Sequence, residues 1–98
     1  MIIELDGLSI SSEQDFHKRI ASAFPVAEYY GNNLNSLWDL LSTDVERPIE
    51  IVWKNSKESE QSMGETFKKI ISIFERTKNQ DISLGLDEKF EYKLKYKN

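Results

Sequence analysis

The chain has 98 residues, of which 39% are hydrophobic and 31% are charged, a composition typical of one small globular domain. It contains no cysteine and a single histidine, which excludes disulfides, thiolate metal sites and cysteine–histidine catalysis. The net charge of −4 argues against a general nucleic-acid binder, because phosphate groups attract a basic surface.

The first segment predicts a strand followed by a helix. MIIEL favours a short strand, and the Asp-Gly pair after it favours a turn. Ser11 or Ser12 can cap the helix, whose apolar residues recur at helical spacing: Phe16, Ile20, Ala23 and Phe24. Pro25 ends the helix, because the residue before a proline is disfavoured in helical geometry. His17 lies in the charged run EQDFHKR, so we expect it to be solvated and to bind no metal.

A second helix is expected after Gly31, with Asn32 or Asn33 as its N-cap. Its core face, at the i, i+3, i+7 spacing, consists of Leu34, Leu37 and Leu41. At about 100° per residue, the outward face carries Asn35, Asp39 and Ser42. Trp38 lies at the border between the two faces, so it either packs in the core or contacts a partner.

The second half predicts three strands and one long helix. PIEIVW is expected to be a strand opened by Pro48, with Trp53 in the core. NSKESEQS is either a loop or an irregular helical turn, and an amphipathic helix follows from about Glu65 to Lys78. DISLGL is a strand candidate, and KFEYKLKYK shows the apolar–charged alternation of a half-buried strand.

This order of elements predicts a small α/β domain. Strands separated by helices favour parallel crossovers, so we expect a three-stranded parallel sheet packed with helices. The last strand is expected to join through a hairpin at residues 87–89, which would make it an extra C-terminal antiparallel strand.

The negative charge is concentrated in residues 28–50, which carry five acidic residues and one arginine. Such a patch attracts a basic partner and speeds its encounter. Asp39, Asp44 and Glu46 could in principle do acid–base work. However, the segment has no nucleophile–base pair and no ligand loop of the kind that binds calcium, so we expect neither a catalytic residue nor a metal site.

KFEYKLKYK admits two interpretations. Its interleaved lysines and aromatic residues could form a platform for single-stranded RNA. Alternatively, its apolar face packs inward while the lysines protect an exposed sheet edge from pairing with other chains. We favour the second interpretation.

The stretch YYGNNLNSLWDLL resembles the signature of the barstar family of intracellular ribonuclease inhibitors, in which a tyrosine pair and a glycine lead into N-x-[DN]-x-L-W-D-x-L. RPIEIVW and the helix ending IFERTK resemble later elements of that family, so the resemblance covers about residues 1–86. It implies one barstar-like domain over residues 1–98, with residues 87–98 as a C-terminal extension.

The resemblance implies that the second helix and the segment before it block a ribonuclease active site. By motif, Asp39 takes the place of an RNA phosphate and meets cationic groups of the nuclease. A carboxylate on a rigid helix can do so through charge-assisted hydrogen bonds. The implied partner-binding residues are Tyr29, Tyr30, Gly31, Asn33, Asn35, Trp38, Asp39, Ser42, Asp44, Val45, Glu46, Glu75 and Arg76.

Three positions depart from the family pattern. Asn35 stands where the family often has a second aspartate, and Asp44 stands where barstar has an exposed tryptophan. Arg76 stands in place of an acid, with Glu75 beside it as a possible substitute, and an arginine would repel a basic nuclease. These departures leave the identity of the ribonuclease open, and a secreted or contact-delivered toxin is one candidate.

We therefore expect a cytoplasmic, non-catalytic ribonuclease inhibitor or immunity protein that occludes a basic extracellular or toxin ribonuclease. The N-terminus lacks the features of a signal peptide, and the longest apolar run is too short to span a membrane. No cofactor, small-molecule substrate or direct nucleic-acid contact is expected. The alternatives are a barstar-like interaction or nucleic-acid-associated regulator that inhibits no ribonuclease, and an enzyme that uses Asp39 and Glu46.

Overall fold

The computed structural model describes residues 1–24 and 29–97, so the predicted helix stop at Pro25 lies outside the described residues. In chain order, the elements are β1 (Ile2–Asp6), α1 (Glu13–Ala23), α2 (Leu34–Asp39), the π-helical turn η2 (Leu40–Asp44), β2 (Ile49–Lys54), α3 (Ser56–Met63), α4 (Glu65–Ser83) and β3 (Phe90–Leu94). Within the described ranges, no helix is long and apolar enough to cross a membrane.

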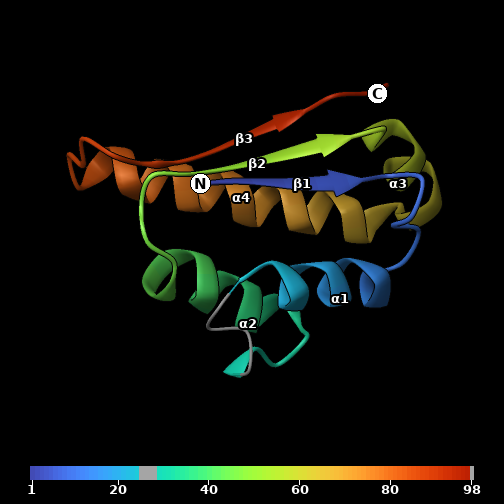
Figure 1. Ribbon diagram of the computed structural model, residues 1–98, viewed down its shortest axis with the longest axis horizontal. Helices are drawn as coiled ribbons and strands as arrows, with labels where there is room; N and C mark the ends of the chain where they lie inside the picture. The colour runs from blue at the N-terminus through green and yellow to red at the C-terminus, as the bar shows by residue number, and fades with distance from the viewer. Residues whose placement is uncertain (25–28, 98) are drawn as a thin grey trace.

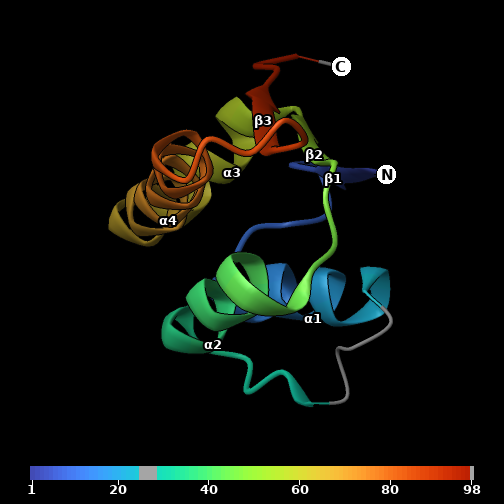
Figure 2. The same cartoon turned by 90° about the vertical axis from the view of Figure 1, so that its left-hand side faces the viewer.

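A three-stranded parallel sheet is present, as predicted, and its strand order is β1-β2-β3 (Figure 1). Helices α1 and α2 connect β1 to β2, and α3 and α4 connect β2 to β3, because a parallel crossover needs a long connection. Figure 2 shows these helices on one side of the sheet. The other face carries cross-strand ion pairs, Lys54 with Glu4 at 2.5 Å and Lys93 with Glu50 at 3.7 Å.

The structure corrects two predictions in the C-terminal half. The predicted strand DISLGL is instead the end of α4 and the turn after it, in which Gly85 has a φ of +67°. The final strand, β3, is parallel to β2 rather than antiparallel. The reason is that α4 runs for 19 residues before the chain turns, so β3 enters the sheet from the same end as β2.

The residues expected to form a C-terminal extension therefore contain the third strand of the sheet. Within β3, Phe90 is fully buried and its ring lies 5.7 Å from that of Phe74 on α4. A residue buried in this way contributes to folding through the apolar area that it removes from water.

The core lies between the sheet and the helices and is centred on Trp53, which is fully buried as predicted. Its ring stacks on Phe16 of α1 at 5.5 Å between centroids and 18° between planes. Its Nε1–H donates to Ser59 Oγ at 3.1 Å, and that hydroxyl donates to the Ile10 carbonyl at 2.7 Å. Ser59 lies on α3, which spans most of the stretch NSKESEQS. This stretch is therefore a regular helix rather than a loop.

Candidate functional site

The chain enters α2 through a defined cap. Asn33 is the N-cap, because its Oδ1 accepts the Ser36 N–H at 2.8 Å, while its Nδ2 donates to the Gly31 carbonyl at 3.2 Å. A Cβ on Gly31 would lie 2.5 Å from Ser36 Oγ, so a larger residue there would push against the first turn of the helix. This cap sets the direction of the tyrosine segment relative to α2.

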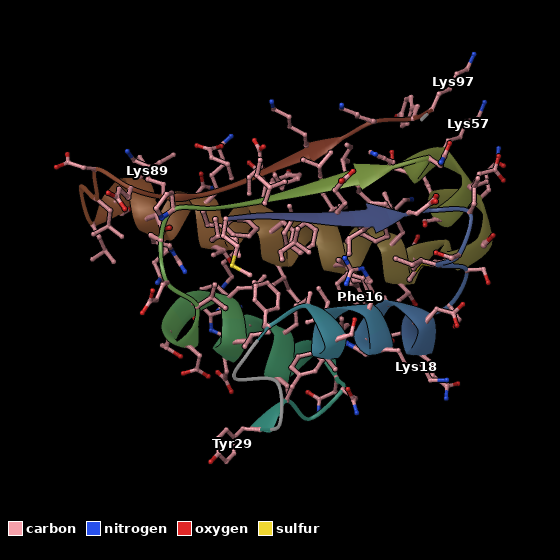
Figure 3. The ribbon with its side chains drawn as sticks, in the orientation of Figure 1. Phe16, Lys18, Tyr29, Lys57, Lys89 and Lys97 are labelled. Atoms are coloured by element: carbon pink, nitrogen blue, oxygen red, sulfur yellow. The ribbon has the colours of Figure 1, made fainter. Side chains whose placement is uncertain are left out.

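The two tyrosines before the cap have different environments. Tyr29 is 85% exposed and projects away from the rest of the protein (Figure 3), whereas Tyr30 is 9% exposed. The Tyr30 hydroxyl is hydrogen-bonded to His17 Nδ1, and burial raises the pKa of Tyr30 well above its ordinary value of 10.0. The segment is therefore anchored by one tyrosine and exposes the other.

The predicted solvated position of His17 is wrong, since this side chain is only 3% exposed. The imidazole can be buried because both ring nitrogens have partners: Nδ1 meets Tyr30, and Nε2 lies 2.9 Å from Glu13 Oε2. Residue 17 thus links α1 to the segment that precedes α2. The charged neighbours of His17 in the sequence concealed this role.

The tyrosine segment before α2, α2 itself and η2 surround a shallow depression of about 160 Å³. It is lined by Tyr29, Tyr30, Ser36, Asp39, Leu40 and Asp44. Among the described residues, neither Asp39 nor Asp44 forms an ion pair. Both residues are exposed. The depression therefore offers two carboxylates and an aromatic wall to a cationic group.

The helix widens immediately after Asp39. The Val45 N–H donates to the Leu40 carbonyl at 3.1 Å, five residues back, and Thr43 Oγ1 donates to the Asp39 carbonyl at 2.6 Å. This π-helical geometry, which is frequent at functional sites, changes the register of the outward face. Ser42 is accordingly half-buried rather than fully outward, and its carbonyl accepts a hydrogen bond from Gln80 at 3.4 Å.

A buried ion pair fixes the chain beyond η2. Arg47 donates to both carboxylate oxygens of Asp81, at 2.7 and 3.1 Å, and to the Val45 carbonyl at 2.8 Å. The Phe90 N–H also donates to Asp81, at 2.7 Å. Burial alone would raise the pKa of Asp81, but Arg47 and the Phe90 N–H outweigh it and hold that pKa below 3.8. The sequence pattern indicated neither partner as part of this network.

Trp38 and Arg76 form an unpredicted contact between α2 and α4. The guanidinium carbon of Arg76 lies 3.9 Å from the centroid of the Trp38 ring. The ring is half-buried and the arginine is exposed. Trp38 is therefore packed on one side and available as the base of a surface contact on the other.

Glu75 does not share this position. Its Oε2 accepts the Tyr92 hydroxyl at 2.5 Å, on the side of α4 that meets β3. Burial and this hydrogen bond raise the pKa of Tyr92 to about 12. Of the two neighbouring charges on α4, the structure thus brings Arg76 to the Trp38 surface.

The other predicted residues fall into two groups. Asn35, on α2, and Glu46, two residues after η2, are exposed. Val45 is 9% exposed and acts mainly through packing and its carbonyl. In the part of the chain that the structure describes, no cluster of three or more histidines and carboxylates could hold a metal ion.

Comparison with known proteins identifies related sequences. The family described as Barstar (barnase inhibitor) matches residues 1–97. A protein of Bacillus subtilis (strain 168) named "Putative ribonuclease inhibitor YrdF" is 26% identical over 78 residues, which cover 80% of this chain and 86% of that protein.

Proposed function

The chain belongs to the barstar family, and we propose that it inhibits a ribonuclease by covering its active site with α2, η2 and the segment before them. The family description supports a ribonuclease-inhibitor-like role, and the name of the Bacillus subtilis relative refers to the same activity. The observation that carries the proposed mechanism is the depression in which Asp39 and Asp44, neither of them ion-paired to a described residue, lie beside exposed Tyr29.

The chemistry of a ribonuclease explains why this surface suits it. A cleft that binds the RNA backbone must present cationic groups to phosphates. A carboxylate on α2 can enter such a cleft and accept charge-assisted hydrogen bonds in place of a phosphate. The depression around Asp39 receives a cationic side chain of the nuclease, and Tyr29 covers it with apolar area.

The proposal extends to the partner and its location. The partner is a basic ribonuclease that is secreted or delivered as a toxin, and the chain protects the cytoplasm as an immunity protein or antitoxin. The action is stoichiometric occlusion without catalysis, so it requires no cofactor and no direct contact with RNA. The acidic segment 28–50, with five acids and one arginine, supports a basic partner.

Titration of barnase with this chain tests the proposal. RNA cleavage should fall linearly and stop at one equivalent of the chain, and a complex of the two proteins should be isolated by size-exclusion chromatography. A panel of basic bacterial ribonucleases broadens the test to partners that fit better. If a molar excess of the chain leaves every ribonuclease of the panel fully active, the proposed function is wrong.

The alternative of a nucleic-acid-associated regulator rests on KFEYKLKYK. In this stretch Phe90 is fully buried, and Tyr92 is half-buried against Glu75. Only Tyr96, at 62% exposure, is left as a stacking surface among the described aromatic residues of the strand and its tail. One aromatic ring is a poor platform for successive bases, so this geometry favours packing over RNA binding.

A further inference from the structure

We propose that Arg76, stacked on Trp38, is the specificity determinant of this surface and that it selects ribonucleases carrying a carboxylate beside their cationic cleft. This inference rests on the proposed function and deepens it by naming the chemistry of the partner. It makes the binding surface bipolar, with Asp39 and Asp44 as its anionic part and Arg76 as its cationic part.

The two parts of the surface are held together by the fold. Trp38 directly precedes Asp39 on α2, and α2 packs against α4, which carries Arg76. The guanidinium carbon lies 3.9 Å from the Trp38 ring centroid, which is contact distance. Arg76 thus contacts the residue that directly precedes Asp39 in the chain.

The stacking leaves the hydrogen-bonding edge of the guanidinium available. A guanidinium that lies on an aromatic ring uses its flat face, while its N–H donors point outward in the plane of the group. Those donors match a carboxylate in a two-bond arrangement. The Trp38 ring therefore orients Arg76 before binding, which lowers the conformational entropy that binding would otherwise cost.

Three carboxylates of α4 and β3 are engaged by other residues. Glu75 accepts the Tyr92 hydroxyl at 2.5 Å, and Asp81 pairs with Arg47 at 2.7 Å. Glu91 lies 3.7 Å from Lys78. Among the described residues Arg76 has no ion pair, so its charge is available to an external group.

The consequence is discrimination between nucleases. A ribonuclease with a lysine or arginine opposite Arg76 meets a like charge at a desolvated position, which weakens binding. A ribonuclease with an aspartate or glutamate there gains a charge-assisted pair. The residue opposite Arg76 would therefore discriminate between basic ribonucleases, because the Asp39 side recognises the cationic cleft that all of them share.

A charge-swap experiment with barnase as the scaffold tests the inference. Barnase and variants in which single basic residues around its cleft are replaced by glutamate are measured against the wild-type chain, Arg76→Glu and Lys69→Glu. Lys69→Glu is the matched control, because it makes the same charge change at another exposed position of α4. At least one barnase variant should bind the wild-type chain about tenfold more tightly than barnase does, and Arg76→Glu should reverse that preference.

The inference would be overturned if Arg76→Glu changed the binding free energy by the same amount with barnase and with every barnase variant, so that the effects were additive. The proposed function would survive that result if Asp39→Ala still weakened binding. If neither barnase nor any variant bound the wild-type chain or Arg76→Glu, the inference would fail, whereas the proposed function would be decided by the wider panel of basic bacterial ribonucleases.

A second measurement needs no nuclease. The chain has two tryptophans, and Trp53 is fully buried, so the difference in fluorescence between the wild type and Trp38→Phe reports on Trp38. Arg76→Gln should shift that Trp38 emission and increase its quenching by acrylamide, while Lys69→Gln should not. Unchanged Trp38 emission and quenching in Arg76→Gln would show that the stacking is absent in solution and would overturn the inference.

Discussion

At the scale of single residues, the Asp39 carboxylate is expected to contribute to binding and little to folding. Its carboxylate lines the depression and forms no ion pair with any described residue, while its backbone carbonyl accepts a hydrogen bond from Thr43 Oγ1. In a complex, the same carboxylate would be desolvated among cationic groups. Its removal would then leave those groups buried without a partner.

We predict that Asp39→Ala weakens binding to an inhibited ribonuclease by about 2–5 kcal/mol, a loss of about thirty- to several-thousand-fold in affinity. Asp39→Asn should also bind weakly, because it keeps the shape and loses the charge. The free energy of unfolding should change by less than about 0.5 kcal/mol, since the residue is exposed. Inhibition titrations and urea denaturation measure the two effects, and wild-type affinity of Asp39→Ala would refute the phosphate-mimic mechanism.

At the scale of elements, the N-cap of α2 controls how firmly the binding helix begins. Asn33→Ala should lower the free energy of unfolding by about 0.5–2 kcal/mol, because the Ser36 N–H loses its acceptor. Asn33→Asp should restore most of that loss, since a carboxylate caps equally well. Asn35→Ala, at an exposed position two residues later, is the control and should stay within about 0.5 kcal/mol. Equal urea midpoints for Asn33→Ala and Asn35→Ala would contradict the capping role.

The elements that local patterns predict are those whose buried positions are apolar. The Leu37 and Leu41 face, the Asn33 cap and the Trp53 strand were all readable because spacing and residue type agreed. The last turns of α4 could not be predicted in this way, because the buried face of the helix continues through the polar residues Thr77 and Asp81. Periodicity in hydrophobicity alone therefore ended the helix too early.

Contacts between distant residues were beyond local patterns for a different reason. Arg47 meets Asp81 and Trp38 meets Arg76 only because the sheet order brings α2, η2 and α4 together. Neither spacing nor residue type specifies that order. The motif placed Asp39 and the tyrosines in one segment, but the depression that they share depends on the π-helical turn after Asp39.

At the scale of the whole molecule, the Asp81–Arg47 pair joins α4 and β3 to the chain that follows η2. Asp81→Asn should lower the free energy of unfolding by about 3–5 kcal/mol, because it leaves Arg47 partly buried without a counter-charge. Asp87→Asn, the same chemical change at an exposed position, should alter it by less than about 0.5 kcal/mol. Similar urea midpoints for the two variants would rule out a structural role for the pair.

The pair also predicts a pH dependence. The pKa of Asp81 is lower in the folded protein than its ordinary value of 3.8, so the folded state favours the ionised carboxylate. The resulting stability is fully present above pH 3.8 and is lost as pH falls through the lowered pKa. The difference in unfolding free energy between the wild type and Asp81→Asn should therefore be constant at neutral pH and shrink in acid. A difference that stays constant down to pH 2 would contradict this linkage.

The charges of the whole molecule are arranged to orient an approaching partner. The only basic residue of segment 28–50, Arg47, is neutralised by Asp81, so the exposed charges Asp39, Asp44 and Glu46 act without an opposing cation on the segment. Lys57 and Lys97 lie at the opposite end of the molecule from Tyr29 (Figure 3). The field of such a distribution turns the depression toward a basic protein before contact.

The association rate with a basic ribonuclease should consequently fall as salt rises, because the Debye length shrinks from about 30 Å at 0.01 M to about 8 Å at 0.15 M. The dissociation rate should change much less, since contacts at short range are screened weakly. Asp44→Asn should reduce the slope of the association rate against ionic strength. Glu58→Gln, with the same loss of charge on α3, should leave that slope closer to the wild type, because α3 lies away from α2. Stopped-flow measurements of both variants decide the matter, and association rates that are flat between the two salt concentrations would show that the acidic segment does not steer its partner.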